Sequence, residues 1–233
     1  MLDFEIIQAA EKPQKLLIFL HGYNGNLEDY HTTFGWLREC FDNSVIIAPA
    51  APEICDKNPQ KKQWFGMQKH DPKNKRYQLQ TSVEDIIRIY NQTAEDIKNC
   101  ADNLNLFINE QQKIYGLTDS QTYILGFSQG AMLAIFSALS RNQKIGGAFS
   151  LSGLIAGAEI LEENLHSKPY VCLLHGKNDA TVQFKTTDFS LNWLKSHGIN
   201  ASLRTYDSLF HSIIKQEIID VADIIAYNDK HKL

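Results

Sequence analysis

The stretch of sequence that decides the fold runs from Thr122 to Phe136 and reads TYILGFSQGAMLAIF. Its first four residues form a mostly apolar run that predicts a buried strand, and the run after Gly130 predicts a helix. Between the two lies a Gly-x-Ser-x-Gly pattern centred on Ser128. A strand that turns abruptly into a helix strains the backbone at the serine, and side chains two residues to either side would collide there. The pattern predicts a nucleophile elbow, and the alternative is an ordinary glycine-rich turn between two core elements.

The composition is that of an ordinary soluble globule with a sizeable core. Of the 233 residues, 43% are hydrophobic and 21% are charged. We find no linker-like shift in composition and expect one domain over residues 1–233. The net charge of −4 gives no reason to expect nucleic acid or an acidic membrane as a partner.

The sequence also bears on the compartment in which the protein works. No apolar run approaches the ~20 residues of a membrane helix, and the first residues lack the basic and apolar regions of a secretory signal. The four cysteines show no CxxC or Cys/His spacing. We therefore expect a cytoplasmic protein without an integral membrane segment, disulfides or structural zinc.

Apolar runs and helical patterns alternate along the rest of the chain. We expect strands at 2–9, 15–20, 44–48, 144–151, 170–174 and 201–206, and helices at 27–41, 81–115, 184–196 and 213–227. Several strands are apolar at every position, as in a parallel sheet that is buried on both faces. The pattern predicts an α/β fold with a mostly parallel central sheet and helices on both faces. The region 81–115 opens with capping-box spacing at Thr81–Glu84, and its length predicts a kink near Asn99–Asn103.

The segment from Ala51 to Gln80 interrupts this alternation. It contains three prolines, six lysines and Arg76, with the aromatic pair Trp64-Phe65 near its middle. A long loop inside a compact domain is often functional. Its basic residues form either a solvated surface or an electropositive rim that favours anionic or peptide-linked substrates. We expect Trp64 to pack the loop onto the sheet beside a site.

Three residues carry the expected chemistry: Ser128, Asp179 and His211. The carboxyl ends of parallel strands meet at one edge of a sheet, which brings the loops that hold these residues together. Their order along the chain is the Ser, Asp, His order of α/β-hydrolases. We expect Ser128 to attack an acyl carbonyl, His211 to act as general base and then acid, and Asp179 to orient the imidazole. A hydroxyl nucleophile with a histidine base needs no metal and no organic cofactor.

The developing oxyanion requires two N–H donors. One is expected from the backbone of Gln129, the residue after the nucleophile. The other is expected from the loop after the strand that ends in His21-Gly22, where the backbone N–H of Tyr23 is the natural candidate.

Other polar residues near strand ends compete for these roles. Asp207 is the main alternative to Asp179, because it lies in the same loop as His211. We read His21 and His175 as residues that shape their loops, since His175 precedes the acid and does not fit the order of the triad.

Several motifs stand in the order of a known enzyme family: Leu20-His21-Gly22, Pro49-Ala50-Ala51-Pro52 followed by Trp64-Phe65, Gly126-Phe127-Ser128-Gln129-Gly130, His175-Gly176-Lys177-Asn178-Asp179 with Val182, and His211-Ser212-Ile213. They resemble the phospholipase/carboxylesterase family of α/β-hydrolases, which includes the acyl-protein thioesterases. The resemblance covers nearly the whole chain. It implies a compact hydrolase without a large cap domain, with a shallow, partly apolar groove and activity on carboxylic esters or thioesters. It also implies the same triad and the same oxyanion donors.

Three loops depart from the family pattern. Gly66 stands where an acidic residue commonly follows the aromatic pair, Ser208-Leu209-Phe210 replaces a glycine-rich segment, and Tyr23-Asn24-Gly25-Asn26 replaces a loop that commonly contains Leu-Gly-Asp. The acyl-chain preference stays open, because Phe210 and Tyr23 either narrow the groove for short chains or offer apolar surface to long ones.

The expected function is that of a serine hydrolase that cleaves carboxylic esters, and thioesters as a further option, through an acyl-enzyme. Its partner would be a small-molecule ester or acylated substrate, held by Trp64, Phe65 and Phe210. The alternatives are a lysophospholipase or acyl-protein thioesterase for long acyl chains, a peptidase of related fold, and a catalytically silent hydrolase-fold binding module. The sequence leaves open whether the chain forms a homodimer.

Overall fold

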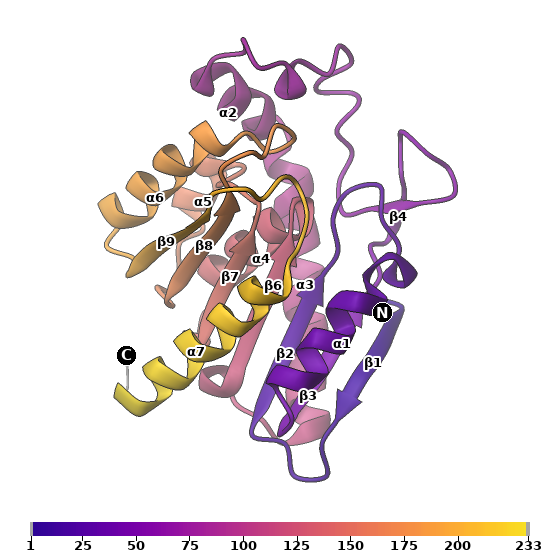
Figure 1. Ribbon diagram of the computed structural model, residues 1–233, viewed down its shortest axis with the longest axis vertical. Helices are drawn as coiled ribbons and strands as arrows, with labels where there is room; N and C mark the ends of the chain where they lie inside the picture. Colours follow the sequence, from indigo (N-terminus) through magenta and orange to yellow (C-terminus); the bar gives the residue numbers. More distant parts are fainter. Residues whose placement is uncertain (1, 232–233) are drawn as a thin grey trace.

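The computed structural model describes residues 2–231, and its centre is a seven-stranded sheet. The strands are β1 (Phe4–Ala9), β2 (Lys15–Leu20), β3 (Ser44–Pro49), β6 (Thr122–Phe127), β7 (Gly147–Leu151), β8 (Val171–Gly176) and β9 (Ala201–Tyr206). They lie in the order β1-β3-β2-β6-β7-β8-β9 (Figure 1). β1 pairs antiparallel with β3 at one edge, and the other pairings are parallel. The predicted mostly parallel sheet is confirmed.

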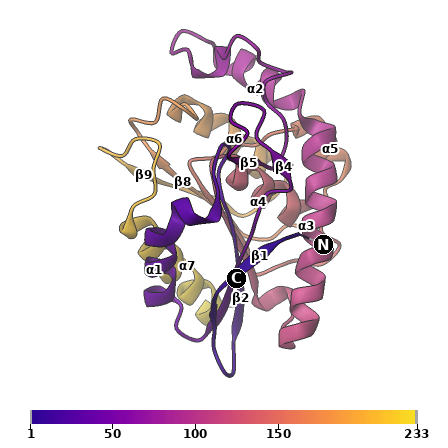
Figure 2. The ribbon, with the colours of Figure 1, turned by 90° about the vertical axis from the view of Figure 1, so that its right-hand side faces the viewer.

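Helices cover both faces of this sheet, as predicted (Figure 2). They are α1 (His31–Cys40), α2 (Val83–Asn91), α3 (Ala94–Tyr115), α4 (Gln129–Ser140), α5 (Ala158–Glu163), α6 (Thr187–Ser196) and α7 (Lys215–His231). Because side chains alternate along a strand, β2 sends Leu17 and Phe19 into the core beneath α1 and α7. Leu16 and Ile18 join the other core, to which α3, α4 and α6 contribute. Burial of both sets explains why this strand is apolar at every position.

The long helical region breaks earlier than predicted. α2 ends at Asn91 and α3 begins at Ala94, so residues 99–103 run through α3 without a break. The break lies at the buried Thr93, whose hydroxyl donates to the carbonyl oxygen of Tyr90 over 2.7 Å. A threonine hydroxyl that bonds the backbone of the preceding turn competes with regular helix geometry.

The start of this region is also shifted by one residue from the predicted capping box. Ser82 is the N-cap, and its hydroxyl accepts a hydrogen bond from the backbone N–H of Asp85 over 3.1 Å. Thr81 instead donates its hydroxyl to the carbonyl oxygen of Lys75 over 2.7 Å. Thr81 therefore closes the preceding loop instead of capping the helix.

The irregular segment between β3 and α2 lies over the carboxyl edge of the sheet (Figure 1). Two short strands, β4 (Glu53–Ile54) and β5 (Lys62–Gln63), pair within it. Gln129, the first residue of α4, holds its middle: the side-chain oxygen accepts from the backbone N–H of Trp64 over 2.9 Å, and the side-chain nitrogen donates to the carbonyl oxygen of Phe65 over 2.7 Å. The loop is thus fixed directly above the predicted elbow.

Candidate active site

Ser128 lies at the sharp turn between β6 and α4. Its backbone has φ +55° and ψ −116°, a conformation that residues with a side chain rarely adopt. Such strain is typical of functional positions that the surrounding structure holds in place. The backbone N–H of Ser128 donates to the carbonyl oxygen of Leu151 in the neighbouring strand over 2.9 Å, which fixes the turn against the sheet.

The two glycines of the motif are required by close backbone contacts. A Cβ at Gly126 would lie 2.1 Å from the carbonyl oxygen of Gly130. A Cβ at Gly130 would lie 2.3 Å from the carbonyl oxygen of Leu20 in β2. Only hydrogen fits at both positions, as the sequence pattern predicts for a nucleophile elbow.

The three residues predicted to form a triad meet at the carboxyl edge of the sheet. Nε2 of His211 lies 3.0 Å from Oγ of Ser128, and Nδ1 of His211 lies 2.7 Å from Oδ2 of Asp179. With the Nδ1 proton donated to the carboxylate, Nε2 is left to accept the serine proton. The ring of Phe127 packs against that of His211 with the ring centres 4.7 Å apart. The imidazole is therefore held from two sides.

Asp179 is buried and held as a carboxylate. Its Oδ1 accepts from the backbone N–H groups of Thr181 and Val182 over 2.8 and 3.0 Å. Burial acts to raise the pKa of Asp179, but hydrogen bonds and charge from His175 and His211 outweigh it and hold that pKa well below its usual range. The rival Asp207 is exposed and pairs with Lys177 over 2.6 Å.

His175 contacts the acid of the site, a role that the sequence analysis did not predict. Its Nε2 lies 2.8 Å from the carbonyl oxygen of Val182 and 3.3 Å from Oδ2 of Asp179. The buried ring thus contacts both the acid and the loop that carries it. The His-Gly pattern after a buried strand was the available signal, and it indicated only a loop-shaping residue.

The two residues expected to supply oxyanion donors, Tyr23 and Gln129, line the same cavity as Ser128. The neighbouring N–H of Gly22 is already bound, because it donates to the hydroxyl of Tyr30 over 2.9 Å. Within residues 2–231, no acceptor is bonded to the backbone N–H of Tyr23 or of Gln129. Gln129 is also the first residue of α4, where a helix presents free N–H groups and the positive end of its dipole.

His21 shapes the loop that carries Tyr23, as the sequence led us to expect. Its Nε2 accepts from the backbone N–H of Ala51 over 3.0 Å, and its Nδ1 lies 2.9 Å from the carbonyl oxygen of Gly22. Burial lowers the pKa of His21, which favours the neutral ring that can accept and donate at once. Its carbonyl oxygen accepts from the indole N–H of Trp64 over 2.8 Å.

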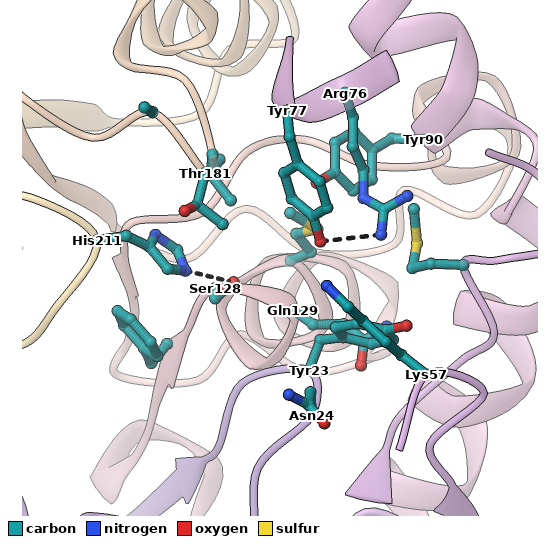
Figure 3. Close-up of a pocket in the computed structure, with 15 residues that line it drawn as sticks. Tyr23, Asn24, Lys57, Arg76, Tyr77, Tyr90, Ser128, Gln129, Thr181 and His211 are labelled. Atoms are coloured by element: carbon teal, nitrogen blue, oxygen red, sulfur yellow. Dashed lines mark hydrogen bonds between the residues drawn. The ribbon is translucent and has the colours of Figure 1, made fainter. Parts of the chain in front are cut away.

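A cavity of about 390 Å³ opens beside the triad. Figure 3 shows His211 and Thr181 on one side and Lys57, Arg76 and Tyr77 on the other. The full lining is Tyr23, Asn24, Lys57, Met67, Arg76, Tyr77, Tyr90, Phe127, Ser128, Gln129, Met132, Ala180, Thr181, Val182 and His211. Tyr77 and Tyr90 were missed as site residues, because no motif marks them in the sequence, and Arg76 was named only as one of the basic residues of the loop.

The three expected substrate contacts do not line this cavity. Trp64 and Phe65 are 1% and 0% exposed and belong to the core, where they anchor the loop. Phe210 is 66% exposed and is not among the lining residues. From sequence alone, an aromatic residue in an irregular segment could belong either to the core or to a binding site. The burial of Trp64 and Phe65 shows that both belong to the core.

Comparison with known proteins agrees with this geometry. The family model described as phospholipase/carboxylesterase matches residues 1–229. The chain belongs to this family. It is 29% identical to acyl-protein thioesterase 1 of Aspergillus fumigatus, over 93% of this chain and 89% of that protein. It is 23% identical to esterase YpfH of Escherichia coli, over 97% and 88% of the two chains.

Two solved structures share the fold. Esterase PE8 superposes with a TM-score of 0.79 at 25% identity, over 97% of both chains. SOBER1 of Arabidopsis thaliana superposes with a TM-score of 0.76 at 22% identity, over 91% of this chain and 98% of that one. The chain is accordingly a carboxylic ester hydrolase with the α/β-hydrolase fold.

Residues 2–231 contain neither a membrane-spanning helix nor a cluster of metal-ligating side chains. No helix in this range has the length and apolarity to cross a bilayer. In the same range, no three His, Cys, Asp or Glu side chains are grouped as ligands for a metal ion.

Proposed function

We propose that this family member is a serine hydrolase with Ser128, His211 and Asp179 as its triad. Oγ of Ser128 attacks the carbonyl carbon while Nε2 of His211 takes the hydroxyl proton. The imidazolium, stabilised by Asp179, then gives that proton to the departing alcohol or thiol. Water attacks the acyl-enzyme with His211 again as base, and the acid is released. The observation that carries the proposal is the hydrogen-bonded chain from Asp179 through His211 to Ser128.

The backbone N–H groups of Tyr23 and Gln129 are proposed to bind the oxyanion. Both lie beside the nucleophile and are free to donate. Preorganised donors of this kind are worth about 10²–10³ in kcat each in other acyl-transfer enzymes.

The proposed substrates are small or medium carboxylic esters and thioesters. The support is the size of the cavity, about 390 Å³, which lies at the small end of ligand sites. A second candidate is hydrolysis of long acyl chains on proteins, which the similarity to acyl-protein thioesterase 1 favours.

We also propose that residues 1–233 act as one domain, in the cytoplasm. The support for one domain is a single seven-stranded sheet that joins both halves of the chain. The support for the compartment is that all four cysteines are free thiols. Gel filtration at several concentrations would distinguish a monomer from a homodimer.

The nucleophile is tested by labelling with a fluorophosphonate, which reacts with activated serines. We expect stoichiometric labelling of the full chain and none in Ser128→Ala, together with loss of ester hydrolysis. Ser208→Ala is the matched control, because Ser208 is exposed in the loop that leads to His211. A chain that never reacts would be a silent binding module, and labelling that persists in Ser128→Ala would place the nucleophile elsewhere.

A further inference from the structure

The cavity beside Ser128 has an unbalanced charge. Two of its lining residues, Lys57 and Arg76, are cationic, and no aspartate or glutamate lines it. Burying a guanidinium group costs free energy of desolvation. Contact with an alkyl chain would not offset this cost. The two cationic side chains therefore indicate that the cavity binds a polar or anionic group.

Arg76 is held rigidly in the wall of the cavity. Its side chain is 1% exposed and pairs with the buried Asp71, with Nη1 2.9 Å from Oδ2. The same carboxylate accepts the backbone N–H groups of Lys75 and Arg76 over 2.7 and 3.0 Å. Nη2 of Arg76 donates to the hydroxyl of Tyr77 over 2.9 Å. Because Asp71 balances its charge, Arg76 acts mainly as a fixed set of N–H donors.

Lys57 supplies the charge that is left unbalanced. Among the residues 2–231, no carboxylate forms an ion pair with its ammonium group, which lies 5.7 Å from the centre of the Tyr77 ring. Figure 3 shows this amine directed into the cavity, across from Ser128 and His211. A cation held over an aromatic face stays charged and keeps its N–H donors available.

Phenols complete this side of the cavity as neutral groups. Burial, with the hydrogen bond to Asp56, raises the pKa of Tyr23, and burial raises the pKa of Tyr90. Neither carries a negative charge at neutral pH. They add no repulsion toward an anion that reaches Lys57.

We propose that this hydrolase selects esters that carry a carboxylate, which Lys57 and Arg76 bind while Ser128 attacks the ester carbonyl. The inference rests on the proposed function and narrows its substrate class. A carboxylate is a monoanion and matches the single unbalanced charge, whereas a phosphate monoester carries close to two charges at neutral pH. The N–H groups of Arg76 that Asp71 and Tyr77 leave free, and the ammonium group of Lys57, can both donate to a carboxylate.

The test compares matched esters with the full chain. Monoethyl adipate carries the carboxylate on the acyl side, and its neutral match is ethyl hexanoate. 6-Acetoxyhexanoate carries it on the alcohol side, and its neutral match is hexyl acetate. We expect kcat/KM, followed by acid release at pH 7.5, to favour one charged ester over its match by about ten- to a hundredfold, the range of a charge-assisted hydrogen bond. The favoured pair tells which side of the ester faces Lys57.

Variants assign the preference to this side chain. Lys57→Met should bring the ratio of charged to neutral turnover close to one, and Lys57→Arg should keep most of it. Lys73→Met is the matched control, because Lys73 is exposed on the same loop and does not line the cavity. Raising the salt from 50 to 500 mM should weaken the preference in the native chain, as screening requires.

Carboxylate selection and ester hydrolysis would be overturned by different results. Equal kcat/KM within both pairs of esters would overturn carboxylate selection while leaving ester hydrolysis in place. No turnover of any of the four esters would overturn the proposed function, and with it this inference. A preference that survives in Lys57→Met would overturn the role of Lys57.

Discussion

The elbow was predictable at the scale of single residues because no side chain larger than hydrogen fits at two of its positions. The sequence pattern required hydrogen at positions 126 and 130, and the structure puts backbone oxygens 2.1 and 2.3 Å from where a Cβ would stand. The triad was predictable for a related reason. A nucleophile, an acid and a base in a fixed order, each after a strand, leave few residues to choose from.

Gly130→Ala should destabilise the protein strongly. The added methyl group would meet the carbonyl oxygens of Leu20 and His21 at 2.3 and 2.5 Å, and backbone of a central strand cannot move aside cheaply. We expect a loss of about 3 kcal/mol or more in the free energy of unfolding, at the upper end of overpacking effects. Chemical denaturation followed by fluorescence measures it.

Gly35→Ala is the matched control for this substitution. Gly35 lies in α1 with no heavy atom within 4 Å of the added Cβ. Alanine there should raise stability by about 0.5–1 kcal/mol, because glycine loses more conformational freedom in a helix. Similar effects of the two substitutions would contradict the steric account of the elbow.

Trp64 packs the loop onto the sheet, as predicted, but residue-level reasoning was wrong to place Trp64, Phe65 and Phe210 in the wall of the cavity. Trp64 and Phe65 are held by Gln129, which follows them by 65 and 64 positions and contacts their backbone, not their rings. No local pattern in the sequence contains such a contact. The motif glutamine was assigned an oxyanion N–H, and its side chain turns out to fix the loop as well.

At the scale of elements, the buried strands were found with small errors in their ends, and helix ends were less certain. β9 matches its predicted bounds, Ala201–Tyr206. Its neighbour β8 extends two residues further than the predicted run, into His175-Gly176. The break between α2 and α3 was misplaced because it depends on a buried side chain, Thr93, and not on a loss of helical periodicity.

The start of α7 carries a buried acid that should make stability depend on pH. Glu217 is 0% exposed, and its Oε2 accepts from the backbone N–H of Ile214 over 3.0 Å. Burial raises the pKa of Glu217 from 4.5 to about 7. The folded chain thus keeps a proton that the unfolded chain releases, so stability falls as the pH rises between these two values. The full cost, on the order of 3 kcal/mol, applies above pH 7.

Glu217→Gln should remove this cost and keep the hydrogen bond, since the amide oxygen can still accept from the backbone N–H of Ile214. We expect the variant to gain stability over the native chain progressively from pH 5 to pH 8, measured by urea unfolding at each pH. Glu95→Gln is the control, because it removes an exposed carboxylate from the first turn of α3. A difference between native and Glu217→Gln that does not change with pH would contradict the buried charge as its cause.

At the scale of the whole molecule, the cavity is assembled from segments far apart in the chain. The loop over the carboxyl edge provides Lys57 and Arg76, the elbow provides Ser128, and the segment after β8 provides Thr181 and Val182. The sequence located the loop and its charge but could not choose between a solvated surface and an electropositive rim. That choice depends on long-range hydrogen bonds, such as those from Gln183 to the backbone of Arg76 and Gln78, which position the loop beside the nucleophile.

Gln183 makes two of these connections, and its removal should loosen one wall of the cavity. Its buried side-chain nitrogen donates to the carbonyl oxygens of Arg76 and Gln78 over 2.9 and 3.0 Å, and so ties the loop to the segment that carries Asp179.

Gln183→Ala deletes both hydrogen bonds. It leaves the buried carbonyl group of Arg76 unpaired, which costs about 1–3 kcal/mol locally, whereas the carbonyl group of Gln78 still accepts from the backbone N–H of Thr81. We expect amide hydrogen exchange in residues 74–81 to accelerate about tenfold or more, while the strands of the central sheet stay protected. The same amides should keep their native protection in Gln143→Ala, which removes an exposed glutamine far from this loop. If exchange in 74–81 is unchanged in Gln183→Ala, other contacts hold the wall. The best candidate is then Lys185, whose ammonium group donates to the carbonyl oxygen of Leu79 over 3.0 Å.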